Sequence, residues 1–219
     1  MGSLSLNQEI ESVLAGFNVP AEVSRRIGEA LARVDDAGVA PGIEVGEQAP
    51  DFSLVDAHRE RLTLSEELAR GPVVVTFFRG AWCPVCNLQV AALHREAPRI
   101  RAAGGSLIGI HPDNATIGGP PPEGFRLALD ADQSVIQAWR LQFRLPPEVR
   151  EIYLGTLDTD VSQLNADGSW NLPAPGTFVI DQGGIVRRRH VTADYTRRME
   201  PEEAIAALEE IRREAAATP

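Results

Sequence analysis

The 219-residue sequence predicts an α/β fold, a three-layer sandwich with a central mixed sheet, preceded by an N-terminal helical arm. Apolar, β-branched runs alternate with segments of helical periodicity through the middle of the chain, which is typical of strands joined by helices. Nearer the C-terminus, two short apolar runs flank a glycine-rich turn and predict a hairpin. The hairpin adds antiparallel strands, so we expect the sheet to be mixed.

Residues 1–42 predict a two-helix arm and a linker, and residues 43–219 predict one α/β domain. The apolar positions that recur at helical spacing are Ile10, Val13, Leu14 and Phe17, then Val23, Ile27, Leu31 and Val34. Pro20 separates the two sets, and glycines with a proline form the linker after them. The apolar faces can pack on the chain's own domain or on a second subunit, and we expect a homodimer through these helices.

The elements of the domain follow in order. The expected strands are Phe52–Val55, Arg61–Leu64, Val73–Phe78, Ser106–Ile110, Phe125–Leu129, Thr177–Ile180 and Ile185–Arg188. The expected helices begin at Ser65 with a capping box, at Pro84 with a kink at Pro98, at Gln133 and at Pro201. Between 145 and 172 the pattern is less regular, and Asn165–Gly168 predicts a hairpin turn.

Composition limits the classes of partner. The net charge of −10 argues against nucleic acid, which needs clustered basic residues. The short runs Arg187–Arg189 and Arg197–Arg198 predict a solvated strand face and the start of a helix. No apolar stretch is long enough for a membrane span, and the N-terminus lacks an export signal. Two cysteines in one motif suit a reducing compartment, so we expect a cytoplasmic protein.

Cys83 and Cys86 lie where the predicted buried strand meets the following helix, in the stretch Arg79-Gly80-Ala81-Trp82-Cys83-Pro84-Val85-Cys86. Pro84 suits the first helical position, which puts Cys83 at the N-cap and Cys86 in the first turn. Unpaired N–H groups and the helix dipole favour a thiolate there, and Arg79 adds positive charge. The pair is within disulfide reach, so it predicts a redox site that cycles between dithiol and disulfide.

Three other interpretations of the cysteines have less support. A structural disulfide across so short a loop removes little entropy from the unfolded chain. A zinc site has only His94 as a nearby third ligand, with no second Cys-x-x-Cys to complete a tetrahedron. Two buried, inert cysteines are the third interpretation. The residues favour redox chemistry, with no metal and no organic cofactor.

Four segments occur in a recognisable order: Gly46–Leu54, the strand running into Phe77–Cys86, Pro175–Asp181, and the closing strand and helix. From Gly46 to Leu208 the sequence resembles the AhpC/TSA family (alkyl hydroperoxide reductase and thiol-specific antioxidant), the peroxiredoxins of the thioredoxin-like fold. Within that family it is similar to the branch that keeps a Trp-Cys-Pro-x-Cys motif.

The resemblance implies a peroxiredoxin-type antioxidant enzyme that reduces hydroperoxides through a Cys83–Cys86 disulfide, which a thioredoxin-type or low-molecular-weight thiol then reduces. Two alternatives stay open. One is a thioredoxin-like protein disulfide reductase with little peroxidase activity. The other is an interaction module without turnover.

The resemblance leaves the order of the two thiols open. The peroxiredoxin pattern Pro-x-x-x-Thr/Ser-x-x-Cys puts Arg79 at the proline, Cys83 at the threonine and Cys86 at the peroxidatic position. The thioredoxin pattern instead makes Cys83 the exposed attacking thiol and Cys86 the buried resolving thiol. The geometry of an N-cap favours Cys83 as the sulfur that a bulky disulfide would meet first.

Other positions are expected to support the site. The arginine that peroxiredoxins keep before the strand at Thr177 is absent, so Arg79 or Arg126 is the candidate replacement. The thioredoxin pattern implies a cis proline at Pro175, opposite the cysteines. Trp82 is expected to shield the thiols and to offer a docking surface.

Overall fold

The computed structural model describes residues 4–114 and 124–217. Its centre is a five-stranded sheet in the order β5-β4-β3-β8-β9. The strands are β3 (Val73–Phe77), β4 (Ser106–His111), β5 (Phe125–Leu129), β8 (Gly176–Ile180) and β9 (Val186–Val191). β4 runs parallel to β3 and β5, whereas β8 is antiparallel to β3 and β9. The predicted mixed sheet is therefore confirmed.

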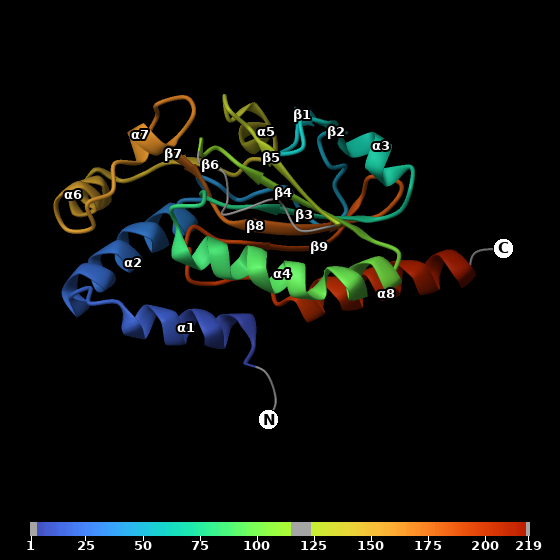
Figure 1. Ribbon diagram of the computed structural model, residues 1–219, viewed down its shortest axis with the longest axis horizontal. Helices are drawn as coiled ribbons and strands as arrows, with labels where there is room; N and C mark the ends of the chain where they lie inside the picture. The colour runs from blue at the N-terminus through green and yellow to red at the C-terminus, as the bar shows by residue number, and fades with distance from the viewer. Residues whose placement is uncertain (1–3, 115–123, 218–219) are drawn as a thin grey trace.

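Helices cover both faces of this sheet, which makes the three layers visible in Figure 1. On one face lie α1 (Leu6–Gly16), α4 (Pro84–Ala102) and α8 (Pro201–Ala217). The other face carries α3 (Leu64–Leu68), α5 (Ser134–Ala138) and the hairpin of β1 (Ser53–Val55) and β2 (Arg61–Thr63). The fold class predicted from sequence is confirmed.

The central strand shows why the chain folds into these layers. All five residues of β3 are buried, and successive side chains point to opposite faces. Val73, Val75 and Phe77 join the core cluster on one face, and Val74 joins the cluster that α4 and α8 complete. A strand buried on both faces needs the continuous apolar run that the sequence supplies.

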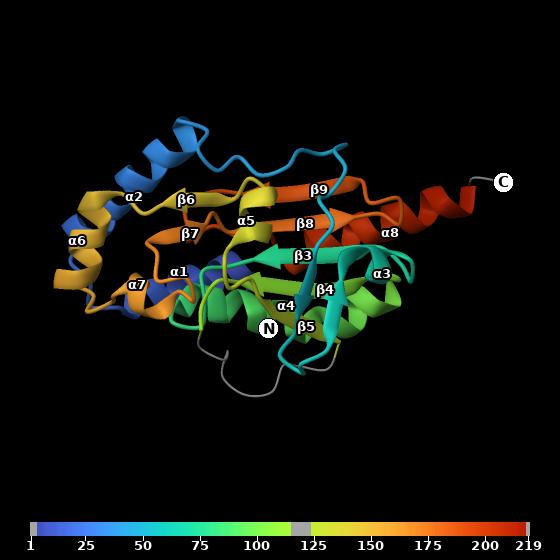
Figure 2. The ribbon, with the colours of Figure 1, turned by 90° about the horizontal axis from the view of Figure 1, so that it is seen from above.

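The remaining elements gather beyond the end of the sheet where β3 stops (Figure 2). They are α2 (Ala21–Asp36), α6 (Pro147–Gly155) and α7 (Val161–Leu164). The short antiparallel pair of β6 (Gln142–Arg144) and β7 (Asn171–Pro173) leads back to β8. These elements surround the N-terminal end of α4.

Both helices of the arm pack on the chain's own domain. Leu6 and Ile10 of α1 are buried in the cluster with α4 and α8, and the Glu200 carboxylate accepts hydrogen bonds from the backbone N–H of Leu6. The α2 side chains Ile27 and Leu31 enter the other core cluster. The two predicted helices are confirmed. The boundary between the arm and the domain, set after residue 42, remains a prediction.

Some local expectations were wrong. Asn165–Gly168 forms a turn between α7 and β7 rather than between two strands of a hairpin. The helix expected from Gln133 to Leu141 is only α5, because Gln133 and Arg140 both have a left-handed φ, 58° and 57°, inside the expected range. No capping box begins α3; instead, the Asp51 carboxylate accepts from the Ser65 N–H.

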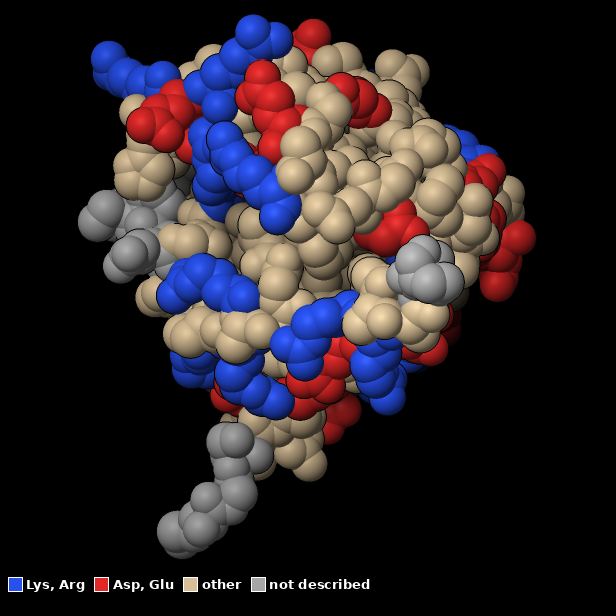
Figure 3. All heavy atoms as spheres, turned by 90° about the vertical axis from the view of Figure 1, so that its right-hand side faces the viewer, with Lys and Arg blue, Asp and Glu red and all other residues tan. Residues whose placement is uncertain are grey.

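Acidic and basic side chains are interspersed on the face seen in Figure 3. Arg188 pairs with Glu203 at 2.6 Å, and Arg187 pairs with Asp181 and Glu214. Arg187 and Arg188 are thus engaged with carboxylates. Among the described residues, no helix combines the length and apolar character needed to cross a bilayer.

Candidate active site

The two cysteines lie at the N-terminal end of α4, as predicted. Cys83 is the N-cap, Pro84 occupies the first turn and Cys86 is buried one turn into the helix. Asn87 donates from its backbone N–H to the Cys83 carbonyl, and from its side-chain Nδ2 to the Ala81 carbonyl. The helix start and the preceding loop are therefore tied together.

The loop before Cys83 depends on a glycine and a buried aspartate. Gly80 has a φ of +139°, a region that side chains rarely adopt, and a Cβ there would lie 2.5 Å from Asp113 Cβ. The Asp113 carboxylate accepts a hydrogen bond from the Ala81 N–H at 2.9 Å. Asp113 follows β4, so the end of one parallel strand anchors the loop that leaves the next.

Both cysteines are free and have no exposed surface. The expectation that Cys83 is exposed was wrong. Arg79 covers it, and the rings of Trp82 and Tyr195 lie against Arg79 in turn, with centroids 5.1 and 3.9 Å from the guanidinium carbon. A shielding role for Trp82 agrees with this arrangement, in which the side chain is partly buried.

Arg79 is the direct partner of Cys83. Its Nη2 donates to the sulfur at 3.0 Å, and its Nη1 donates to the Tyr153 hydroxyl at 2.8 Å. The side chain is 3% exposed, and Nε has no partner among the described residues. A buried cation is costly unless an anion balances it. The group placed to do so is the Cys83 thiolate.

The surroundings separate the acidities of the two thiols. Burial opposes ionisation of Cys83, but the hydrogen bond from the Cys86 thiol and the charges of Arg79 and Arg198 hold its pKa well below the ordinary value. Burial, the hydrogen bond to Cys83 and the negative charge there raise the pKa of Cys86 well above that value. The surroundings thus favour the thiolate on Cys83 and the neutral thiol on Cys86.

A second buried arginine, which we did not predict, lies behind Cys86. Arg198 is 3% exposed, and its Nη2 donates to Cys86 Sγ at 3.7 Å. Its Nε donates to Gln89 Oε1 at 2.8 Å. The expectation that Arg197–Arg198 starts a helix was wrong, because α8 begins at Pro201 and Arg198 lies buried in the segment before it. Its 112-residue separation from Cys86 leaves no local sequence signal.

Thr177 supports this second arginine indirectly. Gln89 Nε2 donates to the hydroxyls of Thr177 and Thr76 at 3.1 and 3.0 Å, and those hydroxyls lie 3.0 Å apart. Gln89 is therefore fixed on one side by two strand threonines and holds Arg198 on the other. Thr177 does not contact either sulfur.

Two expected features are absent. The Arg126 guanidinium pairs with Asp56 and Glu67 at the edge of the sheet, so it does not replace the missing family arginine. No peptide bond in the described residues is cis, so the cis prediction for Pro175 was wrong. Pro175 continues the extended chain into β8, and its carbonyl accepts from the Thr192 N–H, which suits the ordinary trans form.

Metal ligation has no support in the described ranges, where no three His, Cys, Asp or Glu side chains are close enough to share an ion. His94, the third ligand considered for zinc, is exposed on α4. The cysteine pair is left as the reactive group of this region.

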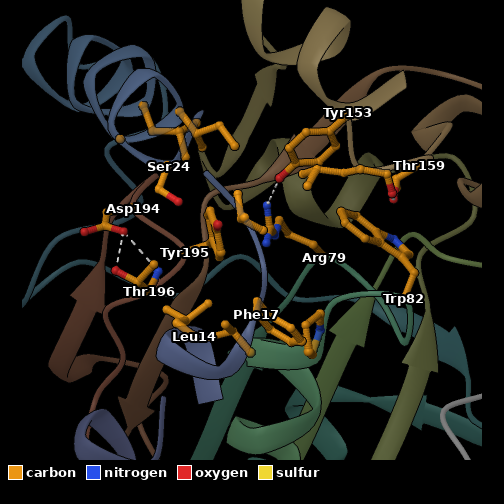
Figure 4. Close-up of a pocket in the computed structure, with 17 residues that line it drawn as sticks. Leu14, Phe17, Ser24, Arg79, Trp82, Tyr153, Thr159, Asp194, Tyr195 and Thr196 are labelled. Atoms are coloured by element: carbon orange, nitrogen blue, oxygen red, sulfur yellow. Dashed lines mark hydrogen bonds between the residues drawn. The ribbon is translucent and has the colours of Figure 1, made fainter. Parts of the chain in front are cut away.

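A cavity of about 530 Å³ opens beside the cysteines (Figure 4). Arg79 projects into it, with Tyr195 on one side and Trp82 on the other. Apolar side chains from α1, α2 and the end of α6 form most of the remaining wall. The guanidinium that contacts Cys83 is therefore also the cation of a mostly apolar chamber, whose other polar lining residues are Ser24, Tyr153, Thr159, Asp194, Tyr195 and Thr196.

Comparison with known proteins gives one family. The family model described as "AhpC/TSA family" matches residues 45–189. The chain is 25% identical over 177 residues to a chloroplastic peroxiredoxin Q of Suaeda salsa. This alignment covers 77% of the present chain and 67% of the relative. It is 26% identical over 145 residues to the chloroplastic peroxiredoxin Q of Oryza sativa subsp. japonica, covering 66% of this chain and 58% of the relative.

Solved structures agree on the fold. Peroxidoxin BcpB from Mycobacterium tuberculosis superposes with a TM-score of 0.53 at 22% identity, covering 77% of this chain and 98% of that one. Xanthomonas campestris peroxiredoxin Q superposes with a TM-score of 0.57 at 16% identity, and the match covers 76% of this chain and 98% of that one. Both matches leave nearly a quarter of this chain uncovered. At these identities the likeness supports the architecture alone.

Proposed function

This chain belongs to the AhpC/TSA family and is an oxidoreductase of the thiol peroxidase class, and we propose that it reduces hydroperoxides with Cys83 as first nucleophile and Cys86 as resolving thiol. The observation that carries the proposal is the 3.0 Å hydrogen bond from Arg79 to Cys83. A buried guanidinium, the hydrogen bond from Cys86 and the helix N-terminus all favour charge on the same sulfur.

The reaction proceeds in three balanced steps. The Cys83 thiolate attacks the terminal peroxide oxygen; an S–O bond forms, the O–O bond breaks, and the alkoxide takes a proton from solvent and leaves as alcohol. Cys83 returns that proton to solvent when its thiolate forms again after the disulfide is reduced. Cys86 then attacks the Cys83 sulfenic acid, so that a disulfide forms and water leaves with the Cys86 proton. An external dithiol reduces the disulfide through a mixed disulfide and supplies two electrons and two protons.

Arg79 has two roles in the first step. It stabilises the thiolate before attack, and its position beside the sulfur lets it donate to the peroxide oxygens as charge develops on them. Arg198 is the positioning residue for the second step. Its charge lowers the pKa of Cys86, against the effects of burial and of the neighbouring sulfur.

Burial weighs against the main rival, a protein disulfide reductase. Neither sulfur has any exposed surface, so a folded disulfide partner would meet Trp82 and Arg79 before Cys83. A small hydroperoxide needs far less access. Reduction of the enzyme disulfide by a thioredoxin-type protein then requires the start of α4 to open, whereas a low-molecular-weight thiol needs less opening.

The decisive experiment traps the oxidised sulfur. The Cys86→Ser protein, given one equivalent of hydroperoxide with dimedone, should carry the adduct on Cys83 by peptide mass spectrometry. The Cys83→Ser protein should consume peroxide no faster than a free thiol. An adduct on Cys86 in the Cys83→Ser protein, formed at the wild-type rate, would reverse the assigned order. Background rates in both variants would favour the interaction module.

A homodimer through the arm also remains part of the proposal. Leu4 and Phe17, at the two ends of α1, are 55% and 42% exposed. Sedimentation of the full chain and of the double variant Leu4→Ser, Phe17→Ser tests it, with a shift from dimer to monomer expected. If both proteins sediment as monomers, the dimer proposal is refuted. The cytoplasmic location stays a prediction, since the curated relatives named above are chloroplastic.

A further inference from the structure

We propose that the N-terminal arm is the specificity wall of the active site and selects hydroperoxides that carry a bulky apolar group; this rests on the peroxidase function proposed above. The arm lies outside the family match, which begins at residue 45. It nevertheless lines the cavity that ends on Arg79. The same chain segment that packs on the domain therefore also shapes the space above the thiolate.

The chamber is much larger than hydrogen peroxide needs. A water molecule takes up about 30 Å³ of the liquid, whereas this cavity holds about 530 Å³. Its size falls in the range of small-molecule sites, roughly 300–1,000 Å³. A substrate with an apolar body would displace water from this space, and that displacement supplies binding energy that hydrogen peroxide cannot obtain.

The chemistry of the walls indicates the body of the substrate. Phe17 and Leu14 approach from α1, and Trp82 faces them from the loop before α4 (Figure 4). Arg79 is the buried cation that projects into the chamber. An apolar group held between these side chains would place its hydroperoxide beside Arg79, which contacts Cys83.

The α2 side of the chamber contains an unusual glycine. Ser24, Ile27, Gly28 and Leu31 line the cavity at i, i+3, i+4 and i+7, which is one face of a helix. Gly28 stands inside α2, where glycine is less stable than alanine by roughly 0.5–1 kcal/mol. A Cβ at Gly28 would meet no heavy atom within 4 Å. The position leaves room for a ligand at a cost in helix stability.

The test fills that room. In Gly28→Leu, the ratio of kcat/KM for cumene hydroperoxide to kcat/KM for hydrogen peroxide should fall about tenfold or more, the scale on which apolar pockets discriminate. Gly16→Leu is the matched control, because it makes the same change on the arm, with open space, at a residue that does not line the cavity. An unchanged ratio in Gly28→Leu would overturn the proposal, as would an equal fall in Gly16→Leu.

A binding measurement separates this proposal from the peroxidase itself. Cumyl alcohol, the product of cumene hydroperoxide, should quench the Trp82 fluorescence of the reduced protein, with weaker binding in Gly28→Leu. Loss of the quenching in the Trp82→Phe protein would assign the fluorescence change to Trp82. Peroxide consumption at the free-thiol rate with intact alcohol binding would refute the peroxidase and leave the apolar site standing. Failure of the alcohol to bind an active enzyme would refute the specificity wall alone.

Discussion

Arg79 Nη2 donates to Cys83 Sγ across 3.0 Å, and this contact joins the two ends of the loop between β3 and α4. The arginine leaves the end of the strand, and the cysteine begins the helix four residues later. The loop thus brings a buried cation and the helix N-terminus to the same sulfur. Thiolate formation at Cys83 follows from the path of the backbone as much as from the residue types.

Replacing Arg79 should raise the pKa of Cys83. A hydrogen bond to a charged group contributes about 1.5–3 kcal/mol, so Arg79→Met should move the pKa upward by about 1–2 units. The rate of Cys83 alkylation by iodoacetamide against pH measures it in the Cys86→Ser background. In the protein that keeps Arg79, the alkylation rate should reach half its maximum at a pH well below the ordinary thiol pKa of about 8.5. Arg79→Lys should restore part of the shift, and identical profiles would refute the contact.

Replacing Arg198 should slow the resolving step. Its charge lowers the pKa of Cys86, so Arg198→Met leaves fewer Cys86 thiolates to attack the sulfenic acid. Cys83 should then accumulate sulfinic acid at high peroxide, as seen by intact mass. Arg197→Met is the matched control, because Arg197 is largely exposed and 3.9 Å from Glu11. Equal overoxidation in both variants would show that Arg198 does not act on Cys86.

Gly80 should tolerate no side chain. A Cβ would lie 2.7 Å from Asp113 Oδ2, and the positive φ adds strain of order 1–3 kcal/mol. Gly80→Ala should lower the free energy of unfolding in urea and displace Arg79 from Cys83, which lowers the peroxidase rate. Gly155→Ala in α6 has open space and an ordinary φ, so it should be neutral or slightly stabilising. A fully active, stable Gly80→Ala would contradict the loop geometry.

The arm should contribute measurably to stability. Ile10 is fully buried between α1 and the helices below the sheet, so Ile10→Ala should cost about 2–5 kcal/mol of unfolding free energy. Leu4→Ala is the control, since Leu4 is 55% exposed. Urea denaturation of both proteins gives the comparison. A loss under 0.5 kcal/mol for Ile10→Ala would mean that α1 is detached in solution.

Local sequence was sufficient to predict the helices, strands and turns whose residues have strong conformational preferences. The apolar run at β3, Pro84 at the start of α4 and the glycine-rich turn between β8 and β9 each carry their own conformational preference. Where the preference was weak, partners elsewhere decided the outcome. An expected helix ended before Arg140, which has a left-handed φ of 57°, and Pro175 followed the extended path of its sheet rather than a family pattern.

The sequence by itself determined the redox motif, its place at a strand-to-helix junction and the nearby positive charge of Arg79, because neighbours along the chain set the helix cap and the loop. Only the tertiary structure showed that both thiols are buried and that a second guanidinium, Arg198 from the segment before α8, contacts Cys86. Desolvation and charge act through space, so a residue more than a hundred positions away contributes to the pKa values of a motif only four residues long.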